Sequence, residues 1–109
     1  MNYTTVASAL RLEGEAVYAA SKAAIEHFTQ TISKEVAPYN ITVNAVGPTP
    51  VKTDLIKTVP KDKIKDLLNK QAIQRFGTFE DIKNVIDFFI DDKSEFITGQ
   101  IIYLGGIHN

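Results

Sequence analysis

The five residues Tyr18-Ala19-Ala20-Ser21-Lys22 decide how the rest of this sequence is interpreted. They open a long stretch with helical periodicity, and residues four apart on a helix lie on one face, one turn from each other. Tyr18 and Lys22 are therefore expected side by side. A lysine ammonium close to a phenol favours the phenolate, which makes a tyrosine usable as an acid or base near neutral pH. Such a short pattern also arises by chance, so its interpretation depends on the surrounding residues.

The stretch belongs to the strongest predicted helix, residues 16–37, which Pro38 ends. Once the helix is under way, its apolar residues recur at intervals of three and four, which is typical of a helix with one buried face. These residues are expected to form the buried stripe, and they are Val17, Ile25, Phe28, Ile32 and Val36.

Three segments have the composition of β-strands. Residues 1–8 are rich in Thr, Val and Tyr, and residues 40–46 form a β-branched run. Residues 100–104, preceded by Phe96-Ile97 and a glycine, predict the last strand. Strands that alternate with helices indicate a parallel sheet wound by crossover connections. The fold class expected is therefore α/β.

A stiff polar loop, Gly47-Pro48-Thr49-Pro50, follows the second strand at its carboxyl end, where ligands bind in open α/β sheets. Residues 51–73 then carry six of the chain's twelve basic residues and predict one or two short helices, with Pro60 near the first turn of the second. A solvated outer face is the simplest interpretation of these lysines, and a basic binding patch is the alternative.

A further helix is expected to begin at Thr78, because Asp81 follows three residues later and approximates a capping box. Its apolar stripe extends to about residue 91 and consists of Ile82, Val85, Ile86 and Phe89.

Composition excludes several classes of function. The 109 residues suit one domain, and the 44% hydrophobic and 23% charged content is that of an ordinary soluble protein. A net charge of -1 gives no reason to expect nucleic acid or a membrane as partner. The chain has no cysteine, which fits a cytoplasmic location. No metal site is expected, because His27 and His108 are too few and too far apart.

Taken together, the motifs resemble the carboxyl-terminal half of the short-chain dehydrogenase/reductase family over essentially all 109 residues. Tyr18-Ala19-Ala20-Ser21-Lys22 looks like the family's Tyr-x-Ala-Ser-Lys core. Asn44-Ala45-Val46-Gly47-Pro48 is similar to its Asn-Ala-x-x-Pro-Gly loop, although Thr49 stands where the glycine usually is. The ending of the chain also matches, through Arg75-Phe76-Gly77, Asp81, Ile97-Thr98-Gly99-Gln100 and Gly105-Gly106, with Leu104 in place of a common aspartate. Within the family, the chain most resembles the 3-oxoacyl-acyl-carrier-protein reductase-like members.

The resemblance implies a partial Rossmann-like parallel sheet, the carboxyl-terminal half of a doubly wound NAD(P)-binding fold. It also implies an oxidoreductase that transfers hydride between NAD or NADP and a small carbonyl or alcohol substrate. Tyr18 would be the catalytic acid or base, Lys22 would assist it, and Thr5, where the family has a serine, would hold the substrate oxygen. The residues implied to contact the cofactor are Tyr18, Lys22, Pro48, Val51 and Thr53.

The glycine-rich part of such a fold is not found in the sequence. No G-x-x-x-G-x-G and no strand-turn-helix precede residue 16. We therefore expect residues 1–109 to be a single unit, a fragment without the amino-terminal dinucleotide-binding half. Alone it should be inactive and bind NAD or NADP weakly or not at all. The edge of strand 1–8 would be unpaired, so homo-oligomerisation or association with the missing half is expected.

Two other interpretations stay open. The chain could be a non-catalytic remnant or self-associating interaction module, which an assay of NAD(P) binding would separate from the first interpretation. It could also be a self-sufficient enzyme of another type that uses Tyr18 and Lys22, although no nucleophile–base pair or metal cluster supports that idea.

Overall fold

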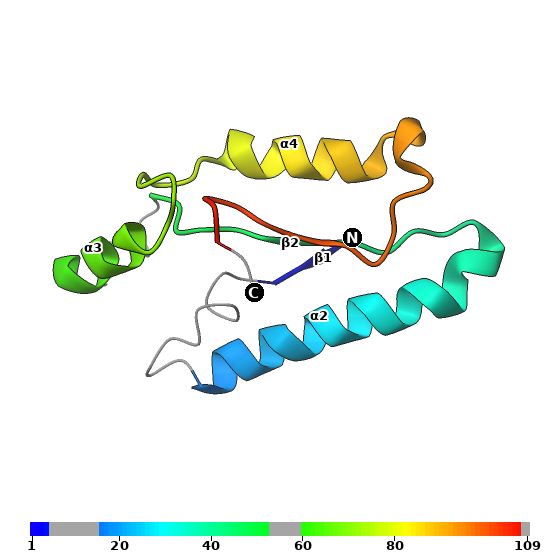
Figure 1. The fold of residues 1–109 in the computed structure, drawn as a ribbon, viewed down its shortest axis with the longest axis horizontal. Coiled ribbons are helices and arrows are strands. Elements are labelled where there is room, and N and C mark those ends of the chain that lie inside the picture. Colours follow the sequence, from blue (N-terminus) through cyan, green and yellow to red (C-terminus); the bar gives the residue numbers. More distant parts are fainter. Residues whose placement is uncertain (5–15, 53–59, 108–109) are drawn as a thin grey trace.

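Three short parallel strands form the centre of the computed structural model, which describes residues 1–4, 16–52 and 60–107. They are β1 (Asn2–Tyr3), β2 (Ala45–Gly47) and β3 (Ile101–Tyr103), arranged in that order, with both neighbouring pairs parallel. Helix α2 lies on one face of the sheet and helix α4 on the other (Figure 1). The α/β class and the parallel sheet predicted from the sequence are confirmed.

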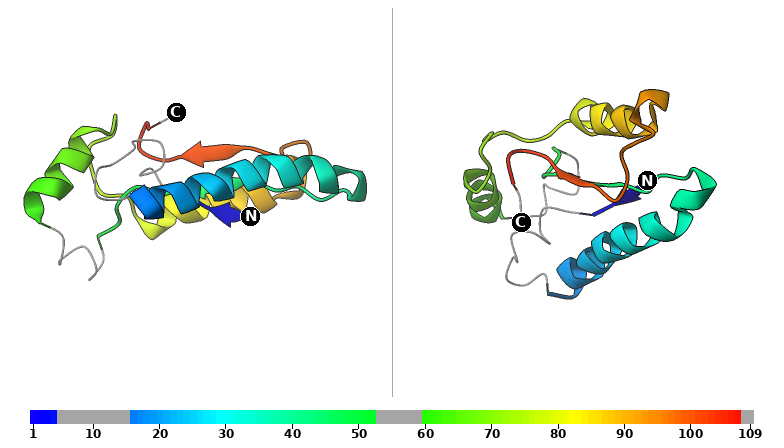
Figure 2. Two further views of the ribbon diagram at one scale, coloured as in Figure 1. Left: turned by 90° about the horizontal axis from the view of Figure 1, so that it is seen from below. Right: turned by 45° about the vertical axis from the view of Figure 1, so that its right-hand side comes forward.

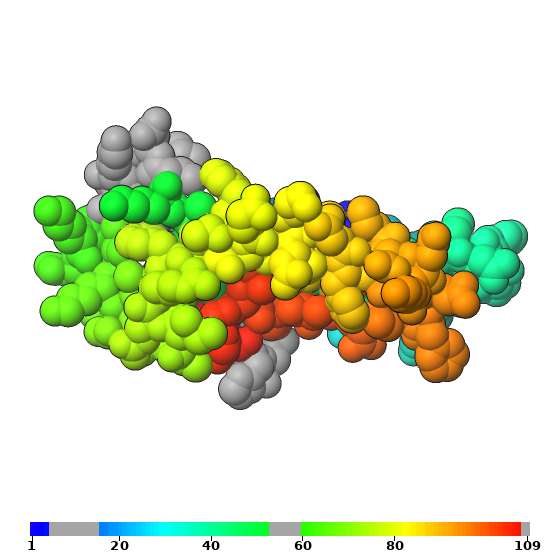
Figure 3. All heavy atoms as spheres, turned by 90° about the horizontal axis from the view of Figure 1, so that it is seen from above, coloured from blue at the N-terminus to red at the C-terminus, as the bar shows by residue number. Residues whose placement is uncertain are grey.

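The core lies on the α4 side of the sheet. Helix α4 (Phe79–Ile90) buries Val85 and Phe89 against Val46 of β2. Three half-buried residues surround this contact, namely Ile97, Ile102 and Leu104. Seen from above, α4 covers much of the sheet, and the end of β3 shows along its side (Figure 3).

The amino end of α4 has the predicted capping box. The hydroxyl of Thr78 accepts from the backbone N–H of Asp81 at 3.1 Å, and the Asp81 carboxylate accepts from the backbone N–H of Thr78 at 2.8 Å. Two N–H groups that have no partner inside the helix are thereby satisfied, so the helix begins where the sequence predicted.

Helix α2 (Ala16–Val36) agrees with the predicted range and continues into a short 3-10 helix, η1 (Ala37–Tyr39). The face that it turns to the sheet is polar, however, with Glu26, Thr29 and Ser33 as its buried residues. The predicted buried stripe is wrong for Val17 and Phe28, which are 86% and 58% exposed. The other three predicted residues, Ile25, Ile32 and Val36, are half-buried.

The polar face of α2 follows from what the sheet presents to it. The side chain of Asn2 in β1 donates to Thr29 Oγ1 at 2.9 Å, and the hydroxyl of Thr4 donates to Glu26 Oε2 at 2.6 Å. Because side chains alternate along a strand, both polar residues of this segment point to the α2 side. Hydrogen bonding therefore selects which helix residues are buried.

The strand predicted at 40–46 is shorter and later than expected. Asn40 has a left-handed backbone with φ 60°, which separates it from the strand. Side chains satisfy part of the following backbone, since Thr98 Oγ1 accepts from Val43 N–H and Asn44 Oδ1 accepts from Gln100 N–H. These groups are therefore bonded outside a regular ladder, and β2 begins only at Ala45.

The other two predicted strands are also shortened. β1 covers Asn2–Tyr3, and residues 5–8 of the predicted strand 1–8 lie outside the described residues. Phe96 is fully exposed in a turn, so Phe96-Ile97 is not part of the last strand. Gly99, with φ 69°, turns the chain before β3 begins at Ile101.

Helix α3 (Lys61–Asn69) is the short helix predicted after Pro60, which directly precedes its first turn. It lies apart from the sheet, at the end of the molecule towards which the strands point (Figure 1, Figure 2). Its lysines 61, 63 and 65 are exposed, as expected of a solvated face.

Candidate active site

The candidate site lies at the carboxyl ends of the three strands. The amino end of α2, the loop after β2 and helix α3 all lie at this end of the molecule (Figure 1). The carboxyl edge of a parallel sheet is where open α/β proteins bind their ligands, because loops and helix ends converge there.

Tyr18 and Lys22 occupy successive turns of α2, as their spacing predicts. The ammonium nitrogen of Lys22 lies 5.8 Å from the centre of the Tyr18 ring. Tyr18 is 49% exposed, and Lys22 is half-buried. The structure therefore places the two side chains next to each other on one face of α2, as the sequence predicted.

A strand end reaches α2 beside Lys22. The hydroxyl of Thr4, which follows β1, lies 3.3 Å from the backbone carbonyl oxygen of Lys22 and 2.6 Å from Glu26 Oε2. Thr5, the residue predicted to hold the substrate oxygen, lies outside the described residues, and so does Thr53. The structure thus brings the neighbour of Thr5 to the helix that carries Tyr18 and Lys22.

The remaining predicted cofactor contacts lie in the loop after β2. Pro48 directly follows the last residue of β2 and is half-buried. Val51 forms an isolated parallel bridge with Gly77, supported by a 2.9 Å hydrogen bond from Gly77 N–H to the carbonyl of Pro50. These contacts hold the loop against the segment that precedes α4.

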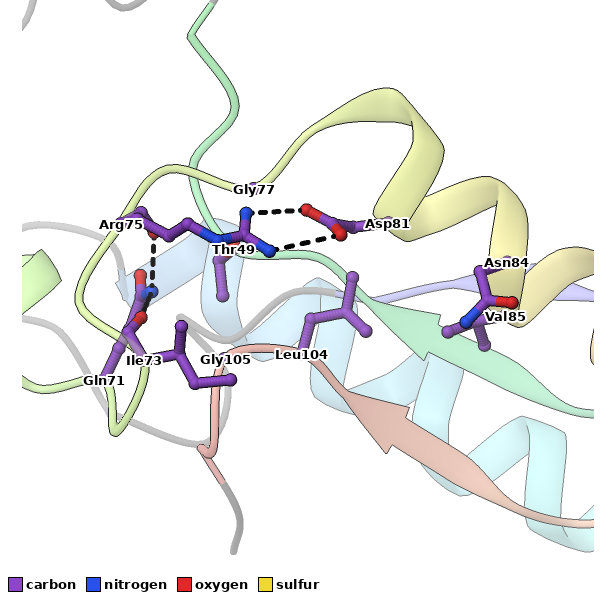
Figure 4. Close-up of a pocket in the computed structure, with 10 residues that line it drawn as sticks. All are labelled: Thr49, Gln71, Ile73, Arg75, Gly77, Asp81, Asn84, Val85, Leu104 and Gly105. Atoms are coloured by element: carbon purple, nitrogen blue, oxygen red, sulfur yellow. Dashed lines mark hydrogen bonds and ion pairs between the residues drawn. The ribbon is translucent and has the colours of Figure 1, made fainter.

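A pocket of about 190 Å³ lies on the α4 side of the same strand ends (Figure 4). It opens between the loop after β2, the segment 71–77, α4 and the end of β3. Its lining includes none of the residues predicted from the sequence as catalytic or cofactor-binding, and consists of Thr49, Gln71, Ile73, Arg75, Gly77, Asp81, Asn84, Val85, Leu104 and Gly105.

An ion pair forms one wall of this pocket. Arg75 Nη1 lies 2.8 Å from Asp81 Oδ2, and Nη2 lies 3.3 Å from Oδ1 (Figure 4). The hydrogen bond from Arg75 and those at Thr78 hold the pKa of Asp81 well below its usual range, and the same pair raises the pKa of Arg75. Asp81 therefore stays ionised at neutral pH and links the segment 71–77 to the start of α4.

Gln71 shapes the floor of the pocket from a buried position. Its side-chain N–H groups donate to the carbonyls of Ile73 and Arg75 at 2.9 and 3.1 Å, which folds this segment back on itself. Gly105, with φ 77°, packs so closely that a Cβ on it would lie 2.9 Å from Thr49 Cγ2 and 3.0 Å from Gln71 Nε2. A glycine is therefore required at position 105 because a larger residue would clash with Thr49 and Gln71.

Sequence reasoning missed the residues that connect α2 to the sheet. Glu26 is 6% exposed and accepts hydrogen bonds from Thr4 and from the hydroxyl of Tyr103. One signal was present, because Glu26 lies four residues after Lys22 and hence on the same face as Tyr18 and Lys22. Its partners on β1 and β3 could not be read from that spacing.

The described residues hold neither a cluster of metal ligands nor a helix that could span a membrane. Within residues 1–4, 16–52 and 60–107, no three His, Cys, Asp or Glu side chains lie close enough together to hold a metal ion. None of the helices in this part of the chain is long and apolar enough to cross a membrane.

Comparison with known proteins agrees with the motifs. The family model described as Enoyl-(Acyl carrier protein) reductase matches residues 1–108. The 3-oxoacyl-[acyl-carrier-protein] reductase FabG of Staphylococcus epidermidis is 36% identical over 106 residues, which are 97% of this chain and 43% of that protein. The uncharacterized oxidoreductase YjdA of Bacillus subtilis is 45% identical over 96 residues, which are 87% of this chain and 37% of that protein.

A solved structure supports the same assignment. The crystal structure of 3-oxoacyl-[acyl-carrier protein] reductase from Brucella melitensis superposes with a TM-score of 0.84 and 28% identity, over 99% of this chain and 41% of that one. The chain thus spans about two-fifths of the length of the relatives that it matches. By its sequence and its fold, this chain belongs to the short-chain dehydrogenase/reductase family of oxidoreductases and is similar to the 3-oxoacyl-acyl-carrier-protein reductases.

Proposed function

We propose that this chain carries the proton-transfer half of an NAD(P)-dependent oxidoreductase that interconverts a small carbonyl compound and its alcohol. The observation that carries the proposal is the placement of Tyr18 and Lys22 on successive turns of α2, at the carboxyl ends of the strands. An exposed phenol beside the side chain of a half-buried lysine is suited to give a proton to a carbonyl oxygen or to take one from an alcohol.

Three residues have separate roles in this proposal. In reduction the Tyr18 hydroxyl donates its proton to the substrate oxygen, and in oxidation the Tyr18 phenolate removes the proton of the alcohol. Lys22 places a positive charge 5.8 Å from the centre of the Tyr18 ring. Thr5 hydrogen-bonds the substrate oxygen, and its neighbour Thr4 is anchored beside Lys22.

The cofactor, when bound, accepts or supplies the hydride, which no side chain can do. The residues that suit its nicotinamide end are Tyr18, Lys22, Pro48, Val51 and Thr53, of which Pro48 and Val51 lie in the loop at the strand ends. No glycine-rich turn for the pyrophosphate occurs in the 109 residues. We propose that this turn is supplied by residues outside this chain, so that residues 1–109 form the carboxyl-terminal half of the complete domain and bind NAD or NADP weakly alone.

The relatives suggest a class of substrate. The Staphylococcus epidermidis and Brucella melitensis proteins are named 3-oxoacyl-[acyl-carrier-protein] reductases. We propose a 3-oxoacyl thioester as the first substrate to assay, and a reaction in the cytoplasm, where NADH and NADPH are available.

Self-association is the second part of the proposal. β1 pairs with β2 on one side, and nothing in the described residues pairs with its other edge. Val17 and Phe28 expose apolar surface on the same helix as the candidate site. An open strand edge and exposed apolar side chains favour association with a second copy or with a chain that carries the dinucleotide-binding half. Light scattering over a concentration series tests association with a second copy, and a chain that stays monomeric throughout would contradict that part of the proposal.

The catalytic proposal is tested in a fusion. Residues 1–108 replace the matching segment of the Staphylococcus epidermidis protein, which supplies the part that this chain does not contain, and oxidation of NADH and NADPH is followed with a 3-oxoacyl thioester. We expect turnover by the fusion, and calorimetry should show weak or no binding of either cofactor to residues 1–109 alone. A fusion that folds and binds cofactor but gives no turnover would contradict the proposal, because the residues that it assigns to proton transfer are all present.

A further inference from the structure

Three residues at the strand ends form one row across the sheet. Gly47 is in register with Tyr103, and the backbone N–H of Thr4 donates to the carbonyl of Val46 at 2.9 Å, which continues the pairing of β1 with β2. Because side chains alternate between the two faces of a strand, Thr4 points to the same side as Asn2, which bonds to α2. The row of Thr4, Gly47 and Tyr103 therefore faces α2.

Glu26 meets this row from α2. Its Oε2 accepts from the Thr4 hydroxyl at 2.6 Å, and its Oε1 accepts from the Tyr103 hydroxyl. The residue is 6% exposed, and a carboxyl buried without partners would be strongly unfavourable. Both of its oxygens are instead satisfied by hydroxyls from the first and third strands of the sheet.

Gly47 provides the space that this contact needs. A Cβ on Gly47 would lie 2.5 Å from Tyr103 Cδ1 and 3.3 Å from Thr4 Cγ2. Gly47 is not among the glycines with positive φ, so its backbone conformation is open to other residues. The glycine is therefore required because the Tyr103 ring lies over β2 at this point and reaches Glu26.

The contact lies next to the proposed proton-transfer pair. Glu26 is one helical turn after Lys22 and two turns after Tyr18. The same Thr4 hydroxyl lies 3.3 Å from the backbone carbonyl of Lys22, and Thr4 directly precedes Thr5 in the sequence. A functional side chain on a helix keeps its direction only when the helix itself is held in place. For a helix packed on a sheet, this means that contacts must prevent it from rotating about its own axis.

We propose that Glu26 is a positioning residue. Held by Thr4 and Tyr103, its side chain fixes the rotation of α2 on the sheet and so directs Tyr18 and Lys22 towards the carboxyl ends of the strands. The value of this arrangement for catalysis rests on the proposed function, but the arrangement itself can be tested without turnover.

The test is hydrogen exchange of backbone amides in the 109-residue chain. Glu26→Met keeps a good helix former and removes both acceptors, so we expect amides 20–26 of α2 to exchange at least about 10-fold faster, while α4 amides keep their rates. Gly47→Ala displaces the Tyr103 ring without altering Glu26, and it should loosen the same amides to a smaller degree because the contact with Thr4 remains. Glu35→Met, at an exposed position of the same helix, is the matched control and should change nothing.

Glu26→Gln tests whether the hydrogen bonds of residue 26, and not its charge, hold α2 in place. In Glu26→Gln the amide oxygen can still accept from Tyr103, and the Thr4 hydroxyl can accept from the amide N–H while donating to the Lys22 carbonyl, so exchange should stay within about 3-fold of the parent. If Glu26→Met does not fold, Tyr103→Phe, which removes one of the two hydroxyls, should give the same local loosening to a smaller degree.

Two results would overturn the inference. Unchanged exchange in α2 after Glu26→Met would show that the carboxyl does not hold the helix. An equal rise in α2 and α4 would show a contribution to general stability without positioning. If α2 loosens as expected but Tyr18→Phe in the fusion keeps full turnover, the positioning stands and the proposed proton transfer fails.

Discussion

Gly99 lies directly against Ser33, since a Cβ on the glycine would be 2.8 Å from Ser33 Oγ. Gly99 also has φ 69°, a conformation that other residues rarely adopt, and its N–H donates to the Val43 carbonyl at 2.7 Å. Space and backbone conformation together therefore require a glycine here, in the turn that leads into β3.

The first prediction follows from that contact. Gly99→Ala should lower the free energy of unfolding by about 1–3 kcal/mol, because the left-handed backbone is strained and Ser33 must move. Urea unfolding measures the change. In a Ser33→Ala background the close contact is removed and the strain remains, so the loss should be smaller. An equal loss in both backgrounds would show that only the backbone conformation matters.

The second prediction concerns the core on the α4 side. Phe89→Ala should lower the free energy of unfolding by about 3–5 kcal/mol, since Phe89 is buried against Val46 and its loss leaves a cavity. Phe96→Ala is the matched control, because Phe96 is fully exposed and should change stability by less than about 0.5 kcal/mol. Thermal and urea unfolding provide the comparison. Similar losses for the two variants would place the core elsewhere.

The third prediction concerns acid. Arg75 and Thr78 lower the pKa of Asp81 in the folded chain below its ordinary value of 3.8. The stability that this carboxylate contributes is therefore fully present above about pH 5, and it is lost as the pH falls through the ordinary value and below. Urea unfolding measures this effect. The difference in unfolding midpoint between the parent and Asp81→Asn should be constant from pH 7 to 5 and shrink below pH 4.

The control for the acid prediction is Asp87→Asn. Asp87 pairs with Lys83 at 2.7 Å on the exposed side of α4 but takes no part in the capping box. Its removal should have a small effect, because exposed ion pairs contribute little. A midpoint difference for Asp81→Asn that persists unchanged to pH 3 would contradict the assigned pKa shift.

The fourth prediction is catalytic. Tyr18→Phe in the fusion should lower kcat by about 100-fold or more and leave folding and cofactor binding unchanged, since only the proton donor is removed. Tyr39→Phe is the control, because Tyr39 is exposed beyond the end of α2. Steady-state oxidation of NADH or NADPH measures the effect. Equal kcat values in the two variants would remove Tyr18 from the mechanism.

Patterns in the sequence predicted α2, the start of α4 and the parallel arrangement of the sheet. The helix around Tyr18 and Lys22 follows from residue periodicity and ends near Pro38 as expected. The start of α4 follows from Thr78 and Asp81, which satisfy each other's backbone groups within four residues. The parallel sheet follows from the order of the elements, because strands joined by helices must cross over.

The sequence by itself determined the cap of α4 and the spacing of Tyr18 and Lys22, because each depends on residues close together in the chain. It also determined the α/β class and the family, because these depend on the order of elements and motifs along the chain. The tertiary structure alone decided which face of α2 is buried, where β2 begins and what holds the candidate site. Glu26 lies on the sheet, and Phe28 is exposed, because Thr4 and Tyr103 supply hydroxyls from distant segments. The spacing of hydrophobic residues predicts that a segment is helical. Which polar side chains are buried depends on their hydrogen-bond partners, which only the folded chain brings together.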